Sequence, residues 1–323
     1  VAEHGPAHRK GLLTSWLQST SGVAFVLSIV VVLLIKSLMP ETAWYSWGWR
    51  IPFIASALLV IVSIYIRNRM SESPLFTEAK SAGQISKTPI CDSFGKKENL
   101  KIVLVAFLGL TLGGGAIGWI TFYALGFMLK TMMLDFDQAN QIIITGILAG
   151  VPFFFLFGWL SDKIGRKGLL MLGMLMGALL FRPIFKGMYQ IGVTNSSEWK
   201  MEEVSAPEIV ESYEDGVPSK STVTYYHYEN GAVKKETKTE TIRDDRPFVD
   251  VSYSLHVSKA DKWRLVFLVF SLQFIFTLAY GPLGAYMVEL FPVRIRYTSV
   301  SFPYHFGVGI FGGLAPYFSA YLV

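Results

Sequence analysis

Charged residues are scarce in this chain of 323 residues: only 16% are Asp, Glu, Lys or Arg, while 52% are hydrophobic. A soluble domain carries about 25% charged residues, so this composition indicates a protein embedded in a membrane. The single cysteine, Cys91, excludes an internal disulfide framework and a cysteine-based metal site. No cleavable signal peptide is visible at the start.

Enzyme and cofactor signatures are also missing from the sequence. It has no phosphate-binding loop, no H-E-x-x-H pair and no serine-centred nucleophile elbow. The net charge of +5 does not form a continuous basic patch, because the basic residues lie in short segments between apolar runs. The sequence therefore predicts no enzyme, no cofactor, no metal site and no nucleic-acid partner.

Apolar runs long enough to cross a membrane recur along the chain. The first has 25 residues without a charge, enough to span ~30 Å of hydrocarbon. Trp44, Tyr45, Trp47 and Trp49 follow it, as aromatic residues do at a membrane interface. Seven spans are predicted, over residues 11–35, 51–66, 102–129, 141–160, 169–185, 265–288 and 301–323.

The charges between the spans predict the orientation. With the loop at 162–168 in the cytoplasm, the inside segments carry 14 Lys and Arg, and the short outside loops carry 3. The inside segments are residues 1–10, 67–101, 162–168 and 289–296. Basic residues favour the cytoplasmic side, so this asymmetry supports the topology. Residues 67–101 are interpreted as a polar, basic linker.

Residues 187–262 differ from the rest, with 14 acidic against 9 basic residues and no long apolar run. Asn230-Gly231 between two polar–apolar segments predicts a β-hairpin with a type I′ turn. Alternating apolar residues predict a further half-buried strand over 249–257. We therefore expect a small β-rich domain inserted between spans, outside the cytoplasm.

A short repeat links the beginning of the chain to a segment near its end. Each copy has the pattern E-x-x-P with a basic residue four positions after the proline, and each leads into an apolar run. The first copy is Glu3, Pro6 and Lys10, and the second is Glu289, Pro292 and Arg296. Parallel repeats of six helices are one way in which transporters are built. Glu289 ends the fourth span of its half, so Glu3 is expected to end the fourth span of an earlier half. This count of spans predicts that the first helices of the earlier half, and the last helix of the later half, are missing. The chain is thus expected to be a fragment.

The loop after the fourth span resembles a known family. Gly158-x-x-x-Asp162-Lys163-x-Gly165-Arg166-Lys167 matches every position of the G-x-x-x-D-[RK]-x-G-[RK]-[RK] signature of the major facilitator superfamily. Glu72-Ser73-Pro74 resembles the E-S-P element of its sugar-porter-like branch. Residues 280–297 and 301–305 resemble the metabolite:proton symporters, which carry proline and betaine, 2-oxoglutarate, citrate or shikimate. The resemblance covers roughly residues 1–186 and 263–323.

This resemblance implies an all-α membrane protein, a major facilitator helical bundle with helices five to eleven of twelve present and a small extracytoplasmic β-rich insertion. The implied function is proton-coupled symport of a small organic acid or zwitterion by alternating access, by a monomer in the bacterial inner membrane. The implied partners are the solute, a proton and the lipid bilayer. The implied parts are the end of an N-terminal half (1–70), a cytoplasmic linker (71–100), a C-terminal half (101–186 and 263–323) and the insert (187–262).

A gating role is implied for the residues of the charged loop and of the E-x-x-P segment. Asp162 is expected to stabilise the positive end of a neighbouring helix, the start of the last span at 297–301. Arg166 or Lys167 is expected to pair with Glu289. The alternative is that these are loop charges that only keep a turn solvated. The candidate gating residues are Gly158, Asp162, Lys163, Gly165, Arg166, Lys167, Glu289, Arg294 and Arg296.

Candidates for substrate binding or proton coupling lie within the spans. His305 is an ionisable residue near mid-membrane, where such groups are functional candidates; its alternative role is a structural hydrogen bond. Trp119 with Tyr123, and Tyr280 with Tyr286, stand at helical spacing, which is also typical of packing. Gln18 and Gln273 are weaker candidates.

Two other functions stay open at this point. A sugar-type facilitator is the nearest alternative within transport. A membrane sensor or receptor that binds a ligand through residues 187–262 is the alternative from another class, although a sensor has no need of the ten-position loop pattern.

Overall fold

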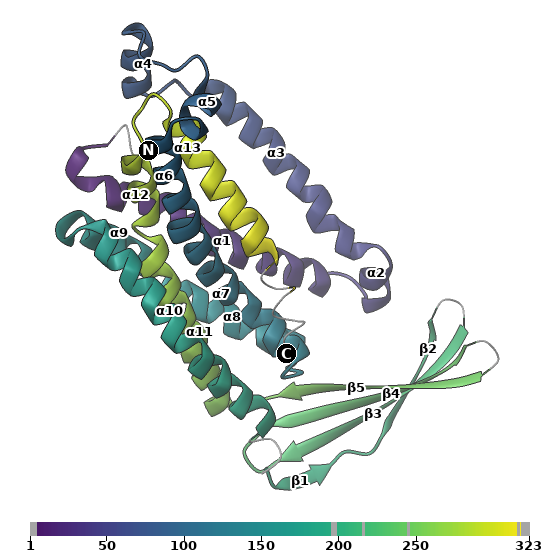
Figure 1. Ribbon diagram of the computed structural model, residues 1–323. Coiled ribbons are helices and arrows are strands. Elements are labelled where there is room, and N and C mark those ends of the chain that lie inside the picture. Colours follow the sequence, from purple (N-terminus) through teal and green to yellow (C-terminus); the bar gives the residue numbers. More distant parts are fainter. Residues whose placement is uncertain (1–4, 195–198, 215–216, 244–245, 315–316, 318–323) are drawn as a thin grey trace. The chain divides into compact units, whose positions relative to one another are not determined.

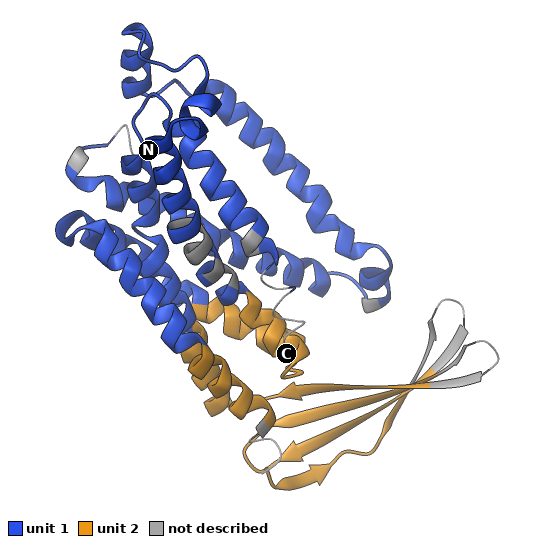
Figure 2. Cartoon of the chain, viewed as in Figure 1, with its two compact units in different colours: residues 1–122, 147–181, 270–323 blue, residues 123–146, 182–269 orange. Residues whose placement is uncertain are grey.

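The computed structural model describes residues 5–194, 199–214, 217–243, 246–314 and 317 (Figure 1). The chain divides into two compact units (Figure 2). Residues 1–122, 147–181 and 270–323 form the first unit, and residues 123–146 and 182–269 form the second. Glu3, the first residue of the E-x-x-P repeat, lies outside the described residues.

The first two predicted spans are helices. A short 3-10 turn (Ala7–Arg9) leads into α1 (Lys10–Ser37). Short α2 (Glu41–Ser46) and a 3-10 turn (Gly48–Arg50) precede α3 (Ile51–Arg69), which has Pro52 in its first turn. A proline is tolerated there because the first N–H groups of a helix have no partner within it.

The linker at 67–101, for which the sequence predicts only a polar segment, contains α4 (Pro74–Ser81), α5 (Pro89–Phe94) and the start of α6 (Lys97–Val105). Ser73 caps α4, because its hydroxyl accepts a hydrogen bond from Phe76 N at 3.2 Å. The Glu72-Ser73-Pro74 element thus starts a helix, with the proline at a position where its missing N–H costs little.

The later spans are helical but interrupted. The third is α6, a π-helical segment (Ala106–Thr111) and α7 (Leu112–Lys130). The fourth breaks between α8 (Phe136–Gly150) and α9 (Pro152–Ile164), since Pro152 has no N–H to donate. The sixth breaks at Gly281-Pro282, between α11 (Lys259–Tyr280) and α12 (Leu283–Leu290).

The other two spans end in π-helical turns. The fifth is α10 (Arg166–Tyr189) with a π-helical extension (Gln190–Thr194). The seventh begins as α13 (Arg296–Tyr304) and continues as a π-helical segment (His305–Gly312). Its remainder to residue 323 lies largely outside the described residues.

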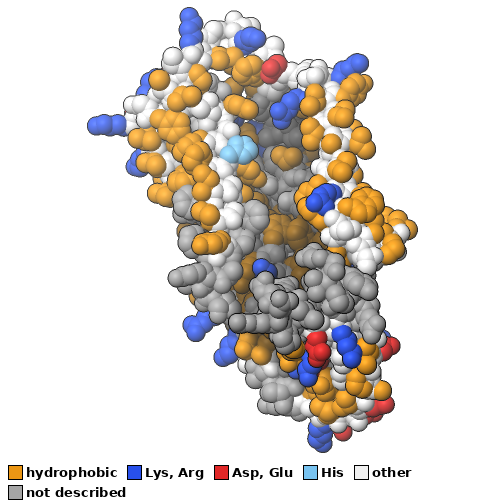
Figure 3. Space-filling model, turned by 90° about the vertical axis from the view of Figure 1, so that its right-hand side faces the viewer, with side chains coloured by type: hydrophobic (Ala, Val, Ile, Leu, Met, Phe, Trp, Pro, Cys, Tyr) orange, Lys and Arg blue, Asp and Glu red, His pale blue; other side chains and the backbone are white. Residues whose placement is uncertain are grey.

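Five helices are long and apolar enough to cross a membrane, in the part of the chain that the structure describes. They cover Lys10–Ser37, Gly48–Arg69, Phe136–Ile164, Arg166–Val193 and Lys259–Leu290. Hydrophobic side chains cover much of the helical surface in Figure 3. In α3, Leu59 is 71% exposed and the helix buries no residue. Such exposed apolar surface is expected on a helix that faces lipid or other helices.

An antiparallel sheet of five strands belongs to the second unit. Its path is β1-β3-β4-β5, with β2 paired to β3. The strands are β1 (Met201–Val204), β2 (Glu208–Glu214), β3 (Val217–Tyr228), β4 (Val233–Arg243) and β5 (Arg246–His256). The predicted hairpin and the predicted strand over 249–257 are therefore present, but Val249 is 53% and Tyr253 41% exposed. That part of the strand is less buried than expected.

The prediction of a type I′ turn in the hairpin is wrong. A type I′ turn needs positive φ at both central residues, and here Gly231 alone of the pair has one, at 79°. Gly231 N donates to Tyr228 O at 2.9 Å, and the Asn230 side chain accepts from Ala232 N at 2.9 Å. The side-chain bond satisfies the backbone locally, so Asn230 does not need the left-handed conformation.

The sheet is fixed to the loop before α8 by hydrogen bonds within the second unit. Leu255 N donates to Met133 O at 2.7 Å, and Asp135 N donates to Leu255 O at 2.8 Å. The Gln138 amide donates to Val257 O at 2.9 Å and accepts from Val257 N at 2.8 Å. Gln138 is 2% exposed, so both bonds are shielded from water.

Helices α1 and α9 approach each other closely in the first unit. A Cβ at Gly158 would lie 2.6 Å from Ser15 Cβ and 2.8 Å from Gly11 O. Either contact is too short for a side chain, so only glycine permits this backbone spacing. Small residues allow such close helix packing in membranes.

We therefore expect Gly158→Leu to destabilise the protein by ~1–3 kcal/mol, since the added atoms push α1 away from α9. Thermal melting in detergent measures the loss. Gly168→Ala is the matched control: a Cβ at Gly168 meets nothing within 4 Å, and the change should stay within ~0.5 kcal/mol. Equal melting of Gly158→Leu and the unchanged protein would show that the two helices are not packed this way.

Candidate functional site

The charged loop is a tight turn between α9 and α10. Gly165 separates the two helices and has φ of 94°, in the region that L side chains rarely adopt. Its N–H donates to Ser161 O at 3.2 Å, which completes the end of α9. Glycine is needed here because this conformation allows α10 to begin at the next residue. The turn places Asp162 and Arg166 beside each other.

Asp162 caps the start of α1. One carboxylate oxygen accepts from Gly11 N at 2.8 Å, and the other accepts from Leu12 N at 3.0 Å. The side chain of Arg9, the residue at the N-cap position of α1, makes no capping hydrogen bond to the helix. A carboxylate at a helix N-terminus satisfies free N–H groups and opposes the positive end of the helix dipole.

This arrangement corrects the predicted recipient of Asp162. The loop pattern predicts the start of the last span at 297–301 as the recipient, but the bonded groups belong to α1. The approach of Gly11 and Gly158 brings the beginning of α1, not of α13, against the end of α9. The capping interaction itself was predicted correctly; its partner was not.

Arg166 joins Asp162 to Glu289. Its Nη2 donates to Asp162 Oδ1 at 2.9 Å, and its Nη1 forms an ion pair with Glu289. The side chains of Asp162 and Arg166 are only 6% and 13% exposed. Charge-assisted bonds of this kind are stronger than neutral ones, and the low exposure reduces their screening by water. The prediction that Arg166 or Lys167 pairs with Glu289 is confirmed for Arg166.

We call these groups the Asp162 network: the first N–H groups of α1, Asp162, Arg166 and Glu289. It connects α1, the end of α9, the start of α10 and the end of α12, all within the first unit. The sequence reasoning missed Gly11 and Leu12 because they take part through backbone N–H groups, which leave no mark in a sequence.

The other basic candidates lie apart from this network. Lys163 stacks over Trp159, with its Nζ 4.1 Å from the ring centroid, and Lys167 is exposed. Arg296 Nε donates to Phe291 O at 2.9 Å. Arg294 lies 3.7 Å from Asp92 of α5.

Asp92 and Ser93 of α5 attach the linker to α13 and to the residues just before it. Hydrogen bonds from Lys96 and Ser86 hold the pKa of Asp92 below its usual value. The neighbouring Ser93 bonds Ser299 through their hydroxyls at 2.8 Å, and both residues are fully buried. Nothing in the sequence predicts these contacts, because the segment has the composition of a polar linker.

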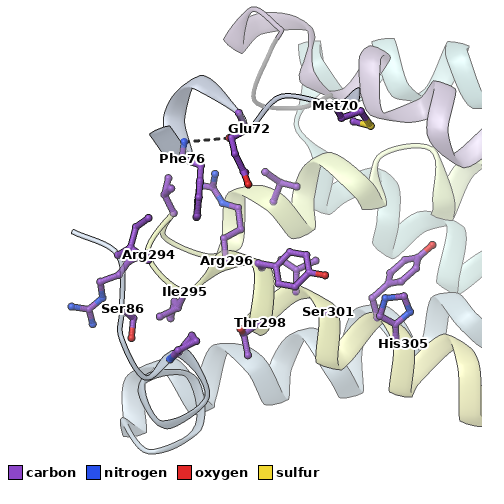
Figure 4. Close-up of a pocket in the computed structure, with 18 of the residues that line it drawn as sticks. Met70, Glu72, Phe76, Ser86, Arg294, Ile295, Arg296, Thr298, Ser301 and His305 are labelled. Carbon is purple, nitrogen blue, oxygen red and sulfur yellow. Dashed lines mark hydrogen bonds between the residues drawn. The ribbon is translucent and has the colours of Figure 1, made fainter. Parts of the chain in front are cut away.

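A cavity of about 780 Å³ lies between the linker and α13. Its walls include Glu72, Phe76, Arg296 and His305 (Figure 4). Arg296 points toward Phe76 and Glu72, Arg294 points away, and His305 lies at the other end of the cavity. His305 is exposed and begins the π-helical segment of the last span.

Tyr123, Tyr280 and Tyr286 are not among the described residues that line this cavity. Tyr280 is 5% exposed and its ring lies 4.4 Å from that of Phe276, so packing explains it. Tyr123 belongs to the second unit, where its ring lies 6.0 Å from Phe185. Tyr286 is half-buried in α12, and the side chain of Trp119 lies outside the described part of the structure. A substrate site made of these four candidates and His305 therefore stays a prediction.

The thermal stability of variants tests the Asp162 network directly. Asp162→Ala leaves Gly11 N and Leu12 N without their acceptor, and should cost ~0.5–2 kcal/mol, as the loss of a helix cap does. Thermal melting in detergent reports the difference. Lys167→Ala removes an exposed charge of the same loop and should melt like the unchanged protein. If both variants melt alike, Asp162 does not cap α1.

Comparison with known proteins agrees with the loop signature. Residues 1–187 match the Major Facilitator Superfamily. The proline/betaine transporter of Escherichia coli (strain K12) is 30% identical over 205 residues, which cover 57% of this chain and 38% of that protein. The shikimate transporter of the same strain is 30% identical over 193 residues, covering 57% of this chain and 42% of that protein.

A third relative extends over the whole chain. The inner membrane metabolite transport protein YhjE of Escherichia coli (strain K12) is 24% identical over 339 residues, covering 100% of this chain and 58% of that protein. The chain thus spans between 38% and 58% of the length of these relatives. No solved structure matches it. Because the family match covers more than half of its residues, this chain belongs to the Major Facilitator Superfamily.

Proposed function

We propose that the protein is a secondary transporter that moves a small organic acid or zwitterion together with a proton by alternating access. The Asp162 network carries this proposal, because it joins α1 to α9, α10 and α12 at one end of the bundle. In the topology that the positive-inside bias supports, this end faces the cytoplasm. The family and its transporter-named relatives indicate a transporter, not an enzyme.

In this proposal the network holds the cytoplasmic side closed and breaks as the two halves rock. By the family's numbering α1 is helix five, from the first half, while α9, α10 and α12 belong to the second. A carboxylate at a helix start contributes ~0.3–1 kcal/mol, and up to ~2 kcal/mol when partly buried. Interactions of this size can hold a state and still be broken in each cycle.

The proposed organisation follows the sequence. Residues 1–70 end the N-terminal half, 71–100 form the cytoplasmic linker, 101–186 and 263–323 form the C-terminal half, and 187–262 form the insert outside the cytoplasm. The protein acts as a monomer in the inner membrane. The relatives named for proline and betaine and for shikimate support a small polar solute. His305, Trp119, Tyr123, Tyr280 and Tyr286 stay the candidates for contact with solute or proton.

A second charged loop is expected in the complete protein. Helix α13 follows the second E-x-x-P copy as α1 follows the first, but the α13 cap residue Ile295 makes no side-chain hydrogen bond to the helix start. The start of α1 is capped by Asp162. The repeat therefore supports a twin of the charged loop that caps α13.

Uptake by the complete protein in membrane vesicles tests the proposal. Labelled proline, 2-oxoglutarate, shikimate and citrate are offered under an imposed pH gradient, and we expect at least one to accumulate. Loss of accumulation when the gradient is collapsed indicates proton coupling. No uptake of any of them, with ligand binding by residues 187–262, favours the membrane sensor; gradient-independent uptake of a sugar favours the facilitator.

Uptake by variants of the Asp162 network tests the gating role separately. Asp162→Asn should slow uptake about tenfold while leaving membrane insertion intact, because an uncharged amide opposes the helix dipole poorly. Arg166→Glu should do the same, and adding Glu289→Arg should restore part of the rate by reversing the ion pair. Unchanged uptake by Asp162→Asn at equal protein amount contradicts the role, as does a double variant slower than Arg166→Glu alone.

A further inference from the structure

Gln273 is a buried polar residue in the middle of an apolar span. It lies about halfway along the span Lys259–Leu290, as Gly22 does in Lys10–Ser37 and Gly150 in Phe136–Ile164. The three residues meet within the first unit. Each helix contributes its middle, so the contact lies near the centre of the membrane, where polar residues are costly and functional candidates by default.

The Gln273 amide has no hydrogen-bond partner among the described residues. The residue is 0% exposed, and neither Nε2 nor Oε1 forms a hydrogen bond with the described residues. Two other buried glutamines are bonded: Gln138 makes two bonds to Val257, and Gln18 bonds Tyr304. Buried polar side chains are nearly always satisfied, so a fully buried amide without partners points to a ligand that the structure lacks.

Two glycines from other helices lie against the Gln273 side chain. A Cβ at Gly150 would lie 3.0 Å from Gln273 Cβ, so the glutamine fills the volume that a side chain there would need. A Cβ at Gly22 would lie 3.5 Å from Gln273 Nε2, an ordinary contact distance. The amide nitrogen therefore faces α1 where that helix has no side chain. The next nearest atoms to that Cβ are side-chain carbons of Ile147 and Val151, which cannot accept a hydrogen bond.

We propose that the Gln273 amide is a binding contact for the transported solute. Nε2 would donate to a carboxylate oxygen, and Oε1 would accept from an N–H or O–H group, so the site fits a small solute that carries both. Helix α1 covers the amide and is also the helix whose start Asp162 caps, so movement of α1 exposes Gln273 to the solute. This inference rests on the proposed transport function.

The experiment compares Gln273→Met with Gln138→Met in the complete protein. Methionine has a similar volume and no hydrogen-bonding amide. Without solute, Gln273→Met should melt at the same temperature as the unchanged protein or higher, since an unpaired buried amide is removed. Gln138→Met should melt lower, because it leaves two Val257 backbone groups unpaired.

Uptake is the second readout. For whichever of L-proline, glycine betaine and shikimate the unchanged protein takes up, Gln273→Met should raise KM about tenfold, the equivalent of one lost hydrogen bond. The effect should be larger for L-proline than for glycine betaine, which has no N–H for Oε1. Gly22→Ala should also raise KM without lowering the melting temperature, because its Cβ fits at 3.5 Å beside Nε2.

The outcomes separate this inference from the transport function. A melting temperature for Gln273→Met reduced as much as that of Gln138→Met shows an amide already bonded, for example by buried water, and overturns the inference whatever is transported. Uptake with an unchanged KM in Gln273→Met overturns it as well. No uptake by the unchanged protein contradicts the transport function, and the melting comparison still decides the state of the amide.

Discussion

The first N–H groups of α1 need acceptors that the helix itself cannot provide, and Asp162 provides them from another helix. This requirement explains why glycines and an arginine surround Asp162. Gly158 and Gly11 bring the two backbones together, and Gly165 turns the chain so that Arg166 reaches Asp162. The spacing of the charged loop is thus the spacing that puts a carboxylate against the start of another helix.

Arg166 balances the charge of this arrangement. Asp162 alone would be a shielded carboxylate, and Arg166 neutralises it while its other amino group pairs with Glu289. Removing one member of such a pair leaves the other uncompensated, so the groups act together. The second unit is held differently, by neutral hydrogen bonds that join Leu255 to the loop before α8 and Val257 to Gln138 of α8. Charged bonds thus hold the start of α1, and neutral bonds hold the sheet.

Much of the fold could be predicted because long apolar runs have few alternatives to a helix. The sequence also identified Asp162, Arg166 and Glu289, since their charges stand in a recognisable pattern. It failed where the determinant is a backbone group or a local bond. The recipient of Asp162 is a pair of N–H groups, the Asn230 side chain changes the hairpin turn, and Ser73 starts a helix within the linker. Gln273 was only a weak candidate, because its lack of a partner depends on Gly22 and Gly150 from distant spans.

We propose that the contact between α1 and the charged loop opens and closes during transport. Spin labels on cysteines at Arg9 and Ile164, both exposed, with Cys91 replaced, report the distance between these two helix ends. In lipid, the account predicts a short and a long distance, with the long one favoured by Asp162→Ala and the populations shifted by a transported solute. A single distance that neither the variant nor the solute changes would contradict it.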